Sequence, residues 1–333
     1  MKILVVGGGS IGRRHFQNLG ILGFENRALA EPDPDRREAL AKENSGDFFE
    51  TLEEGLDWHP DAVIIATPSY LHAEQALAAA RRGCHLFIEK PLSHNLTGLP
   101  ELSWAIMQMG LVSLVGCNMR WHPGPAKVKV LLDGEAIGKV LFARLHTGSY
   151  LPEWRPGQDY RRSYSANAAL GGGCILDCIH EIDLARWYLG QVWAVFCLAD
   201  HVSSLEIDVE DVAVLLCKHA GGAFSEIHLD FVQRTYERGC QIVGEHGSIS
   251  WDFMGKMVKW YDARSGQWTN FEQDADWNIN EMYLDELTHF LDCASSGAQT
   301  VLPVSEAIRV MEIVESARIS TKSGRLTPTK AIG

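Results

Sequence analysis

Positive charge is scarce in this sequence, whose 333 residues include 30 lysines and arginines against 43 aspartates and glutamates, for a formal net charge of -13. This balance argues against DNA or another polyanion as the main partner, because phosphate neutralisation requires a surplus of lysine and arginine. No apolar run approaches the roughly 20 residues that span a bilayer, and no charged leader precedes a cleavable apolar segment. We therefore expect a cytoplasmic protein that binds neither nucleic acid nor membrane.

Paired cysteine spacing is also lacking. The eight cysteines show neither the pattern of a zinc site nor the density of a disulfide framework. Cys174 and Cys178 lie one helical turn apart, but no further ligands follow at a suitable spacing. His180-Glu181 resembles the start of a zinc-protease helix, yet Leu184 occupies the position of the second histidine. We expect buried thiols and no bound metal.

What the chain contains is a globular composition, 46% hydrophobic and 22% charged, in a length that favours two domains. Over residues 1–116, short apolar segments alternate with helical patterns, which indicates parallel strands joined by crossover helices. After residue 120, strand-like segments follow one another with few helices. The sequence therefore predicts an α/β Rossmann fold at 1–120 and an α+β domain with an open, predominantly antiparallel sheet at 121–333. We expect the cofactor in the first domain, and substrate binding and oligomerisation in the second.

Hydrophobic periodicity and turn residues predict the individual elements. In the first domain we expect strands at 2–6, 27–30, 62–66, 85–88 and 112–115, a short one near Phe48, and helices at 11–22, 34–43, 72–82 and 96–109. In the second domain we expect strands at 140–147, 192–199, 212–219, 223–231 and 239–243, and helices at 174–189, 283–295 and 305–316.

A glycine loop directly follows the first expected strand and opens the first helix. Gly7, Gly9 and Gly12 match the dinucleotide-binding pattern G-x-G-x-x-G. Gly7 permits the tight turn, Gly9 lets a pyrophosphate approach the backbone, and Gly12 lets the helix pack closely on the strand. The helix N-terminus offers N–H groups to phosphates, so we also assign Ser10 and Ile11 to the cofactor.

An acidic residue stands at the end of the second strand. Glu31 is placed to accept hydrogen bonds from the adenosine ribose hydroxyls, which favours NAD over NADP because a 2′-phosphate would be repelled. Arg36 or Arg37 can compensate that repulsion, so NADP stays open. The alternative is that Glu31 and Asp33 only shape the turn.

Two further expected strands run into Thr67-Pro68-Ser69-Tyr70-Leu71-His72 and Glu89-Lys90-Pro91. The carboxyl edge of a doubly wound sheet forms the ligand crevice, which places Lys90 where the nicotinamide sits. A partly desolvated lysine there can exchange a proton with a substrate hydroxyl. The alternative for Lys90 is an exposed turn residue.

With these motifs the chain resembles the Gfo/Idh/MocA family of glucose-fructose oxidoreductase, inositol dehydrogenase and rhizopine-catabolism proteins, over nearly its whole length. The resemblance rests on the glycine loop and on further motifs: Ala66-Thr67-Pro68 with His72, Glu89-Lys90-Pro91, Asn118, Arg120, and Gly171-Gly172-Gly173 leading into Asp177, His180 and Asp183. It implies that Lys90 acts in catalysis, and that Asp177 and His180 flank the substrate. It also implies that the cofactor is lined by Thr67, Pro68, His72 and Glu89. We add Ser69 and Arg120 to the cofactor site, with Lys90 contacting both ligands, and Asn118 to the substrate site.

One departure concerns the spacing of the acidic residue. The family commonly carries the aspartate four residues before the histidine, whereas Asp177 stands three before His180. Both spacings share a helix face, so Asp177 is expected to orient the substrate or a neighbouring side chain. Proton transfer then falls to His180 or Lys90. An isolated histidine is more commonly a core residue, but the preceding glycines permit close approach to a ligand.

A loop rich in aromatic, acidic and guanidinium groups extends over residues 150–164. Trp154 can stack on a sugar ring, while Arg155, Asp159 and Tyr160 can hydrogen-bond hydroxyls or an anionic group. The alternative is a structured loop that covers the cleft or a subunit contact.

These features predict a dehydrogenase acting on CH–OH groups. We expect hydride transfer between a secondary alcohol carbon of a sugar, polyol or derivative, including nucleotide-linked or acidic sugars, and NAD(P). One alternative is tightly bound NAD used for transient redox in epimerisation, elimination or glycoside cleavage. Another is a dinucleotide-sensing protein without catalysis. An exposed sheet face in the second domain, as in relatives, favours a homodimer or homotetramer.

Overall fold

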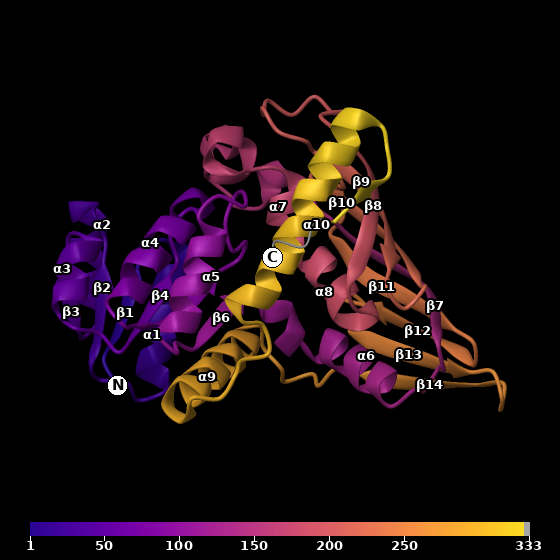
Figure 1. The fold of residues 1–333 in the computed structure, drawn as a ribbon, viewed down its shortest axis with the longest axis horizontal. Helices are drawn as coiled ribbons and strands as arrows, with labels where there is room; N and C mark the ends of the chain where they lie inside the picture. The colour runs from indigo at the N-terminus through magenta and orange to yellow at the C-terminus, as the bar shows by residue number, and fades with distance from the viewer. Residues whose placement is uncertain (330–333) are drawn as a thin grey trace. The chain divides into compact units, whose positions relative to one another are not determined.

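A computed structural model describes residues 1–329, and the chain divides into two compact units (Figure 1). The first unit comprises residues 1–118 and 279–308, and the second comprises residues 119–278 and those from 309 onward. The predicted boundary near residue 120 differs from this division in one respect, because residues 279–308 return to the N-terminal unit. They are held there by paired amides of Asn18 and Asn280 and by edge-on packing of Phe87 against Phe290.

The first unit contains a six-stranded parallel sheet in the order β3-β2-β1-β4-β5-β6. Its strands are β1 (Ile3–Val6), β2 (Arg27–Ala30), β3 (Asp47–Phe49), β4 (Ala62–Ile65), β5 (His85–Glu89) and β6 (Ser113–Gly116). Every residue of β1 and β4 is buried, as expected for strands that helices cover on both faces. The predicted Rossmann fold is confirmed, including the short strand near Phe48.

Helices join these strands in the predicted alternation. They are α1 (Ser10–Ile21), α2 (Pro34–Glu43), α3 (Leu52–Asp57), α4 (Ser69–Arg81) and α5 (Leu99–Gln108), with α9 (Asn280–Ser296) from the later segment. Asp33 caps α2 by accepting the Arg36 N–H, and Thr51 caps α3 by accepting the Glu54 N–H. The short helix α3 was not predicted, and α4 begins at Ser69 rather than at residue 72.

The second unit is built on a nine-stranded sheet in the order β14-β13-β12-β11-β7-β10-β9-β8-β15. Its strands are β7 (Val140–Gly148), β8 (Val192–Asp200), β9 (Val212–His219), β10 (Phe224–Asp230), β11 (Glu237–Gly244), β12 (Gly247–Asp252), β13 (Met257–Asp262), β14 (Gln267–Glu272) and β15 (Thr327–Pro328). Only β7 and β10 pair in parallel, and all other neighbours are antiparallel. The predicted open, predominantly antiparallel sheet is therefore confirmed, while β12 to β15 were not predicted.

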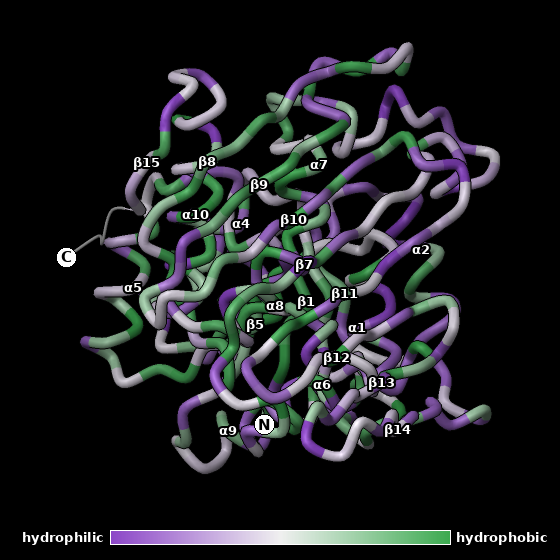
Figure 2. The backbone as a smooth tube through the Cα atoms, turned by 90° about the vertical axis from the view of Figure 1, so that its right-hand side faces the viewer, coloured by the Kyte–Doolittle hydropathy of each residue, from purple (hydrophilic) through white to green (hydrophobic). Residues whose placement is uncertain are grey.

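Helices of the second unit cover one face of this sheet (Figure 1). They are α6 (Pro123–Asp133), α7 (Cys174–Asp177), α8 (Ile179–Leu189) and the part of α10 (Val304–Ser323) from residue 309 onward. Helix α6 packs on β12 and β13, and α8 packs on β7 and β10. Figure 2 views the opposite face of the sheet, which no helix among the described residues of this unit covers.

Short 3-10 turns replace regular structure between β7 and α7. They are Leu151–Glu153, Tyr160–Arg162, Tyr164–Ala166 and Ala168–Leu170, and another such turn, Asn118–Trp121, follows β6. The single helix expected at 174–189 is wrong, because Cys178 leaves the helical conformation (φ -93°, ψ 31°) and separates α7 from α8. Asp177 consequently ends one helix, and His180 lies in the first turn of the next.

Candidate functional site

The glycine loop between β1 and α1 has the backbone shape that its sequence predicts. Gly7 has a φ of 97°, and a Cβ on it would lie 2.8 Å from the Ala66 carbonyl oxygen. A Cβ on Gly12 would overlap the carbonyl oxygen of Gly7. A Cβ on Gly9, by contrast, would meet no atom within 4 Å. Two glycines thus serve the close packing of helix on strand, and Gly9 leaves open space at which a phosphate can approach the backbone.

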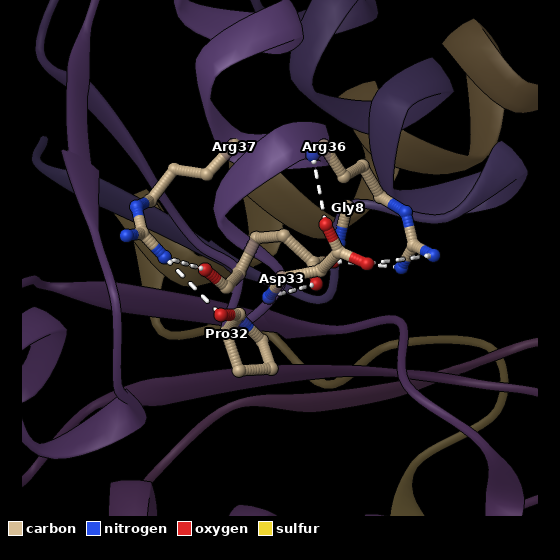
Figure 3. A network of polar contacts seen from close by, with 6 residues as sticks. Gly8, Pro32, Asp33, Arg36 and Arg37 are labelled. Atoms are coloured by element: carbon tan, nitrogen blue, oxygen red, sulfur yellow. Dashed lines mark hydrogen bonds and ion pairs between the residues drawn. The ribbon is translucent and has the colours of Figure 1, made fainter.

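A carboxylate at the end of β2 is bonded to this loop. Glu31 is 3% exposed. Its Oε2 atom accepts the Gly8 N–H at 2.7 Å, and its Oε1 atom accepts the Asp33 N–H at 2.9 Å. Gly8 and Asp33 lie close together at this point (Figure 3). The carboxylate is therefore fixed in orientation beside the phosphate cradle, which fits the ribose-binding role predicted for it.

Two arginines from the start of α2 contact the same turn from opposite sides (Figure 3). Arg36 places Nη1 3.2 Å from the Glu31 Oε2 atom, and its side chain is half-exposed. Arg37 donates to the backbone oxygen of Glu31 at 2.6 Å and pairs with Glu50 at 3.5 Å. Of the two arginines, Arg36 is thus the one whose guanidinium pairs with the carboxylate of Glu31.

The segment after β4 is held by a buried histidine. His72 places Nδ1 2.9 Å from the Pro91 carbonyl oxygen and Nε2 2.7 Å from the Thr67 carbonyl oxygen. Burial lowers the pKa of His72, although both carbonyls and the charge of Glu89 oppose that shift. A neutral ring donates to only one carbonyl. His72 therefore joins the ends of β4 and β5, the two segments that carry the predicted cofactor residues.

Glu89, directly before Lys90, is anchored to α1. Its Oε1 atom lies 2.6 Å from Nε2 of His15, and its Oε2 atom accepts the Lys90 N–H at 3.2 Å. Glu89 and His15 are both buried, and Lys90 is half-buried at the carboxyl end of β5. His15 lies three residues after Gly12, so the helix that opens at the glycine loop also positions the backbone of the predicted catalytic lysine. Sequence reasoning did not find His15.

Asn118, predicted to contact substrate, hydrogen-bonds the side chain of Tyr283 on α9. Arg14 stacks on the ring of Tyr283 with 4.4 Å between the guanidinium carbon and the ring centroid. Burial raises the pKa of the Tyr283 hydroxyl. These contacts all lie within the first unit, which places α9 beside the ends of the parallel strands. Tyr283 carried no local sequence signal, because its partners lie far away along the chain.

In the second unit, Asp177 and His180 are both buried. The hydroxyl of Tyr164 donates to Oδ1 of Asp177 at 3.0 Å. Tyr164 was part of the substrate loop in the sequence reading but received no role. The structure therefore adds a phenol to the predicted pair of aspartate and histidine.

The glycines before α7 approach their own chain. A Cβ on Gly172 would lie 2.5 Å from the Tyr164 carbonyl oxygen and 2.6 Å from that of Ser165. Gly173 has a φ of 106°, and a Cβ there would overlap the carboxylate of Glu210. Burial raises the pKa of that carboxyl. These glycines are explained by packing of the 164–165 backbone against the start of α7, without a ligand.

Arg120 lies in a buried ion pair. Its Nε donates to Oδ2 of Asp183 at 2.8 Å and its Nη2 donates to Oδ1 at 2.7 Å, a bidentate pair whose side chains are 5% and 1% exposed. The guanidinium also stacks on Trp187 at 5.1 Å. Arg120 thereby fixes α8, the helix that carries His180.

The predicted substrate loop separates into two parts. Trp154 donates its indole N–H to Ser149 Oγ at 2.7 Å and packs edge-on against Phe231. Arg155 is exposed and lies over the ring of Tyr164, 5.5 Å from its centroid. Of these two residues, Arg155 contacts Tyr164, whereas Trp154 packs against Phe231.

Asp159 and Tyr160 form a different cluster. Asp159 caps the turn at 160–162 and pairs with Arg161 at 2.8 Å, and the Arg161 partner holds the pKa of the Asp159 carboxyl below its usual value. The Tyr160 hydroxyl accepts the backbone N–H of Glu206 at 3.2 Å. This cluster agrees with the structured-loop alternative for these two residues.

Three features of the described residues bear on ligands and membranes. All eight cysteines are buried, and none forms a disulfide. Within residues 1–329, no group of three or more histidine, cysteine, aspartate or glutamate side chains is arranged to hold a metal ion. In the same part of the chain, no helix combines the length and apolar character needed to cross a membrane.

Comparison with known proteins adds independent findings. The profile described as "Oxidoreductase family, NAD-binding Rossmann fold" matches residues 1–117, and the profile "GFO/IDH/MocA C-terminal domain" matches residues 126–250. The scyllo-inositol 2-dehydrogenase (NAD(+)) of Bacillus subtilis strain 168 is 27% identical over 97% of this chain and 95% of that protein. Inositol 2-dehydrogenase 3 of Saccharopolyspora erythraea is 30% identical over 75% of this chain and 72% of that protein. Levoglucosan dehydrogenase in complex with NADH and levoglucosan shares the fold, with a TM-score of 0.91 at 20% identity over 99% of this chain and 100% of that one.

Proposed function

Because this chain belongs to the GFO/IDH/MocA oxidoreductase family, we propose that it is an NAD(P)-dependent dehydrogenase acting on a secondary alcohol of a sugar, polyol or sugar derivative. The first unit binds the cofactor and the second binds the substrate. The observation that carries the proposal is the glycine loop, which is open at Gly9 and bonded through Gly8 to the buried carboxylate of Glu31. The two relatives named as inositol 2-dehydrogenases support a polyhydroxylated substrate.

The first unit fits a dinucleotide and favours NAD. Gly9 leaves room for the pyrophosphate, and the Glu31 carboxylate is held by two backbone amides where the adenosine ribose lies. A 2′-phosphate would meet that negative charge, which the half-exposed guanidinium of Arg36 offsets in part. When bound, NAD supplies the hydride acceptor.

Lys90 and His180 are the pair proposed to hold and accept the hydroxyl proton, and Asp177 orients that group. Support for Lys90 is its place at the carboxyl end of β5, directly after the anchored Glu89. Support for Asp177 is its burial together with its hydrogen bond from Tyr164.

Trp154, Arg155 and Asn118 are proposed to contact the substrate. Arg155 is exposed, and its guanidinium lies over the ring of Tyr164 at 5.5 Å. An exposed guanidinium in this setting can pair with a carboxylate or phosphate. Acidic and nucleotide-linked sugars therefore belong in the substrate panel beside neutral polyols.

The test is a panel of polyols, aldoses, uronic acids and nucleotide sugars incubated with the full chain and NAD, with NADH absorbance as the readout. We expect stoichiometric NADH release with at least one class. Product formation without net NADH would indicate transient redox on a retained cofactor and overturn the simple dehydrogenase. Binding of NAD with no conversion of any substrate would indicate a sensing protein.

We further propose a homodimer or homotetramer that uses the uncovered face of the nine-stranded sheet (Figure 2). On this face Phe142 pairs in register with Phe224, and Leu216 pairs with Phe196, while Phe224 lies opposite Lys218 and Leu216 opposite Glu226 where β9 and β10 pair. Phe224 and Leu216 are 55% and 50% exposed. Exposed apolar side chains of this kind favour burial against a second copy, because a two-fold axis pairs the same patch on both subunits.

A further inference from the structure

Tyr164 contacts Asp177, the acidic residue proposed to orient the substrate. The Tyr164 hydroxyl lies 3.0 Å from Oδ1 of Asp177, which is 8% exposed. An ionised carboxylate only accepts hydrogen bonds, so the phenol is the donor. We propose that Tyr164, at the end of the substrate loop, is a positioning residue for catalysis: its hydroxyl fixes the Asp177 carboxylate, and its ring contacts Arg155. This inference rests on the proposed dehydrogenase function.

Backbone contacts next to Tyr164 and Asp177 hold their two segments together. Gly173 donates its N–H to the Ser165 carbonyl oxygen at 3.1 Å. A side chain on Gly172 would collide with the carbonyl oxygens of Tyr164 and Ser165. Because only glycine permits this approach, the residues before α7 and the residues of the loop are held directly against each other. The phenol is thereby brought to the end of α7, where Asp177 lies.

A second set of contacts holds the other side of the same segment. The Cys174 N–H donates to the Glu210 carbonyl oxygen, and the Ile175 N–H donates to the Glu210 carboxylate, each at 3.1 Å. The Ala168 N–H donates to Asp208 Oδ1 at 2.7 Å. The start of α7 and the end of the loop are therefore both fixed to residues 208–210, so Tyr164 and Asp177 are carried by segments with a common anchor.

The chemistry of the pair suits positioning. A phenol that donates to a carboxylate forms a charge-assisted bond and holds one oxygen of the carboxylate in place, which restricts its rotation. The face of the same ring lies under Arg155 at 5.5 Å. Tyr164 thus contacts two residues proposed to act on the substrate. Its ring contacts Arg155, proposed to bind the substrate, and its hydroxyl contacts Asp177, proposed to orient it. Loss of the hydroxyl leaves the ring contact and removes one hydrogen bond from the carboxylate.

The experiment compares Tyr164→Phe with wild type in the full chain, using the panel sugar that wild type oxidises. We expect kcat to fall about 10- to 100-fold, the range for losing a hydrogen bond to a charged group, while KM changes less than about threefold. Tyr188→Phe is the matched control, because Tyr188 on α8 also loses a buried hydroxyl bond, to the Pro125 carbonyl oxygen at 3.1 Å. We expect it to retain wild-type kcat and KM.

A double-mutant comparison tests whether Tyr164 acts through Asp177. In an Asp177→Ala background, Tyr164→Phe should lower kcat no further, because the hydroxyl has lost its acceptor. An undiminished effect in that background, a change confined to KM, or a rate equal to that of Tyr188→Phe would each overturn the inference and leave the proposed function standing. A wild-type protein that oxidises no panel sugar would instead overturn the proposed function, and the inference with it.

Discussion

Glu31→Gln is the sharpest test of cofactor choice, because it removes one charge and keeps the shape of the side chain. The glutamine oxygen can still accept the Gly8 N–H that Glu31 accepts at 2.7 Å. Two unit charges about 4 Å apart interact by about 1 kcal/mol in water and about 4 kcal/mol near a protein surface. Allowing for partial compensation by Arg36, we take about 2 kcal/mol, which corresponds to a factor of about 30. The ratio of kcat/KM for NADP to that for NAD should rise by that factor.

The assay is steady-state kinetics with each cofactor at a fixed sugar concentration. Glu50→Gln is the matched control, since it removes the same charge from an exposed carboxylate that pairs with Arg37. Adding Arg36→Ala to Glu31→Gln should abolish most of the gain, because the half-exposed guanidinium is the group available to a 2′-phosphate. A ratio that moves less than about threefold, or no more than in Glu50→Gln, would refute the electrostatic argument.

Three further outcomes are expected. Lys90→Ala should lower turnover by about two orders of magnitude or more, with NAD affinity retained in a titration. Lys129→Ala, which removes a half-buried lysine paired with Asp133 on α6, should leave turnover unchanged. Near-normal turnover of Lys90→Ala would remove Lys90 from the mechanism. Burial and the charge of Arg238 lower the pKa of His122 to about 4. The unfolded state therefore binds this proton more tightly than the folded state does. The stability that comes from the neutral ring is complete above pH 6.5 and is lost as the pH falls toward 4. The free energy of unfolding measured in urea should therefore fall by about 3 kcal/mol across that range because of His122. His122→Asn, which keeps a capping acceptor, should make the free energy of unfolding less dependent on pH. An equally steep pH dependence in this variant would contradict the role given to His122. Leu216→Lys on the uncovered sheet face should shift sedimentation toward the monomer, and an unchanged oligomer would show that this face is not the interface.

Local sequence was sufficient to predict an element where the backbone conformation requires glycine or where hydrophobic periodicity is clear. The glycine loop was recognised from the spacing of Gly7, Gly9 and Gly12; a side chain at Gly7 or Gly12 would collide with the backbone, and Gly9 leaves open space for a phosphate. The strands of the parallel sheet were predicted because both faces are buried, which makes the segments continuously apolar. The strand β14 escaped prediction because most of its residues are exposed and carry no apolar alternation.

The sequence names candidate site residues, but it does not predict their contacts. Lys90, Asp177 and His180 were singled out by motif, whereas the role of Tyr164 emerged only when the loop was seen against α7. Asp159 and Tyr160 have the chemistry of sugar-binding residues, yet the fold pairs them with Arg161 and the backbone of Glu206. Amino-acid type defines what a side chain can bind, and neighbours in space define what it binds.

By itself, the sequence determined the dinucleotide-binding unit, the open sheet that follows it and the residues suited to redox chemistry, because glycine spacing and hydrophobic periodicity act over a few neighbouring positions. Tertiary structure alone decided that residues 279–308 return to the first unit, that Arg120 pairs with Asp183, and that Tyr164 meets Asp177. These contacts join positions separated by 13, 63 and, for Asn18 with Asn280, 262 residues. No local pattern encodes a partner at that distance, since the pairing is selected by burial and by the satisfaction of charges once the whole chain is folded.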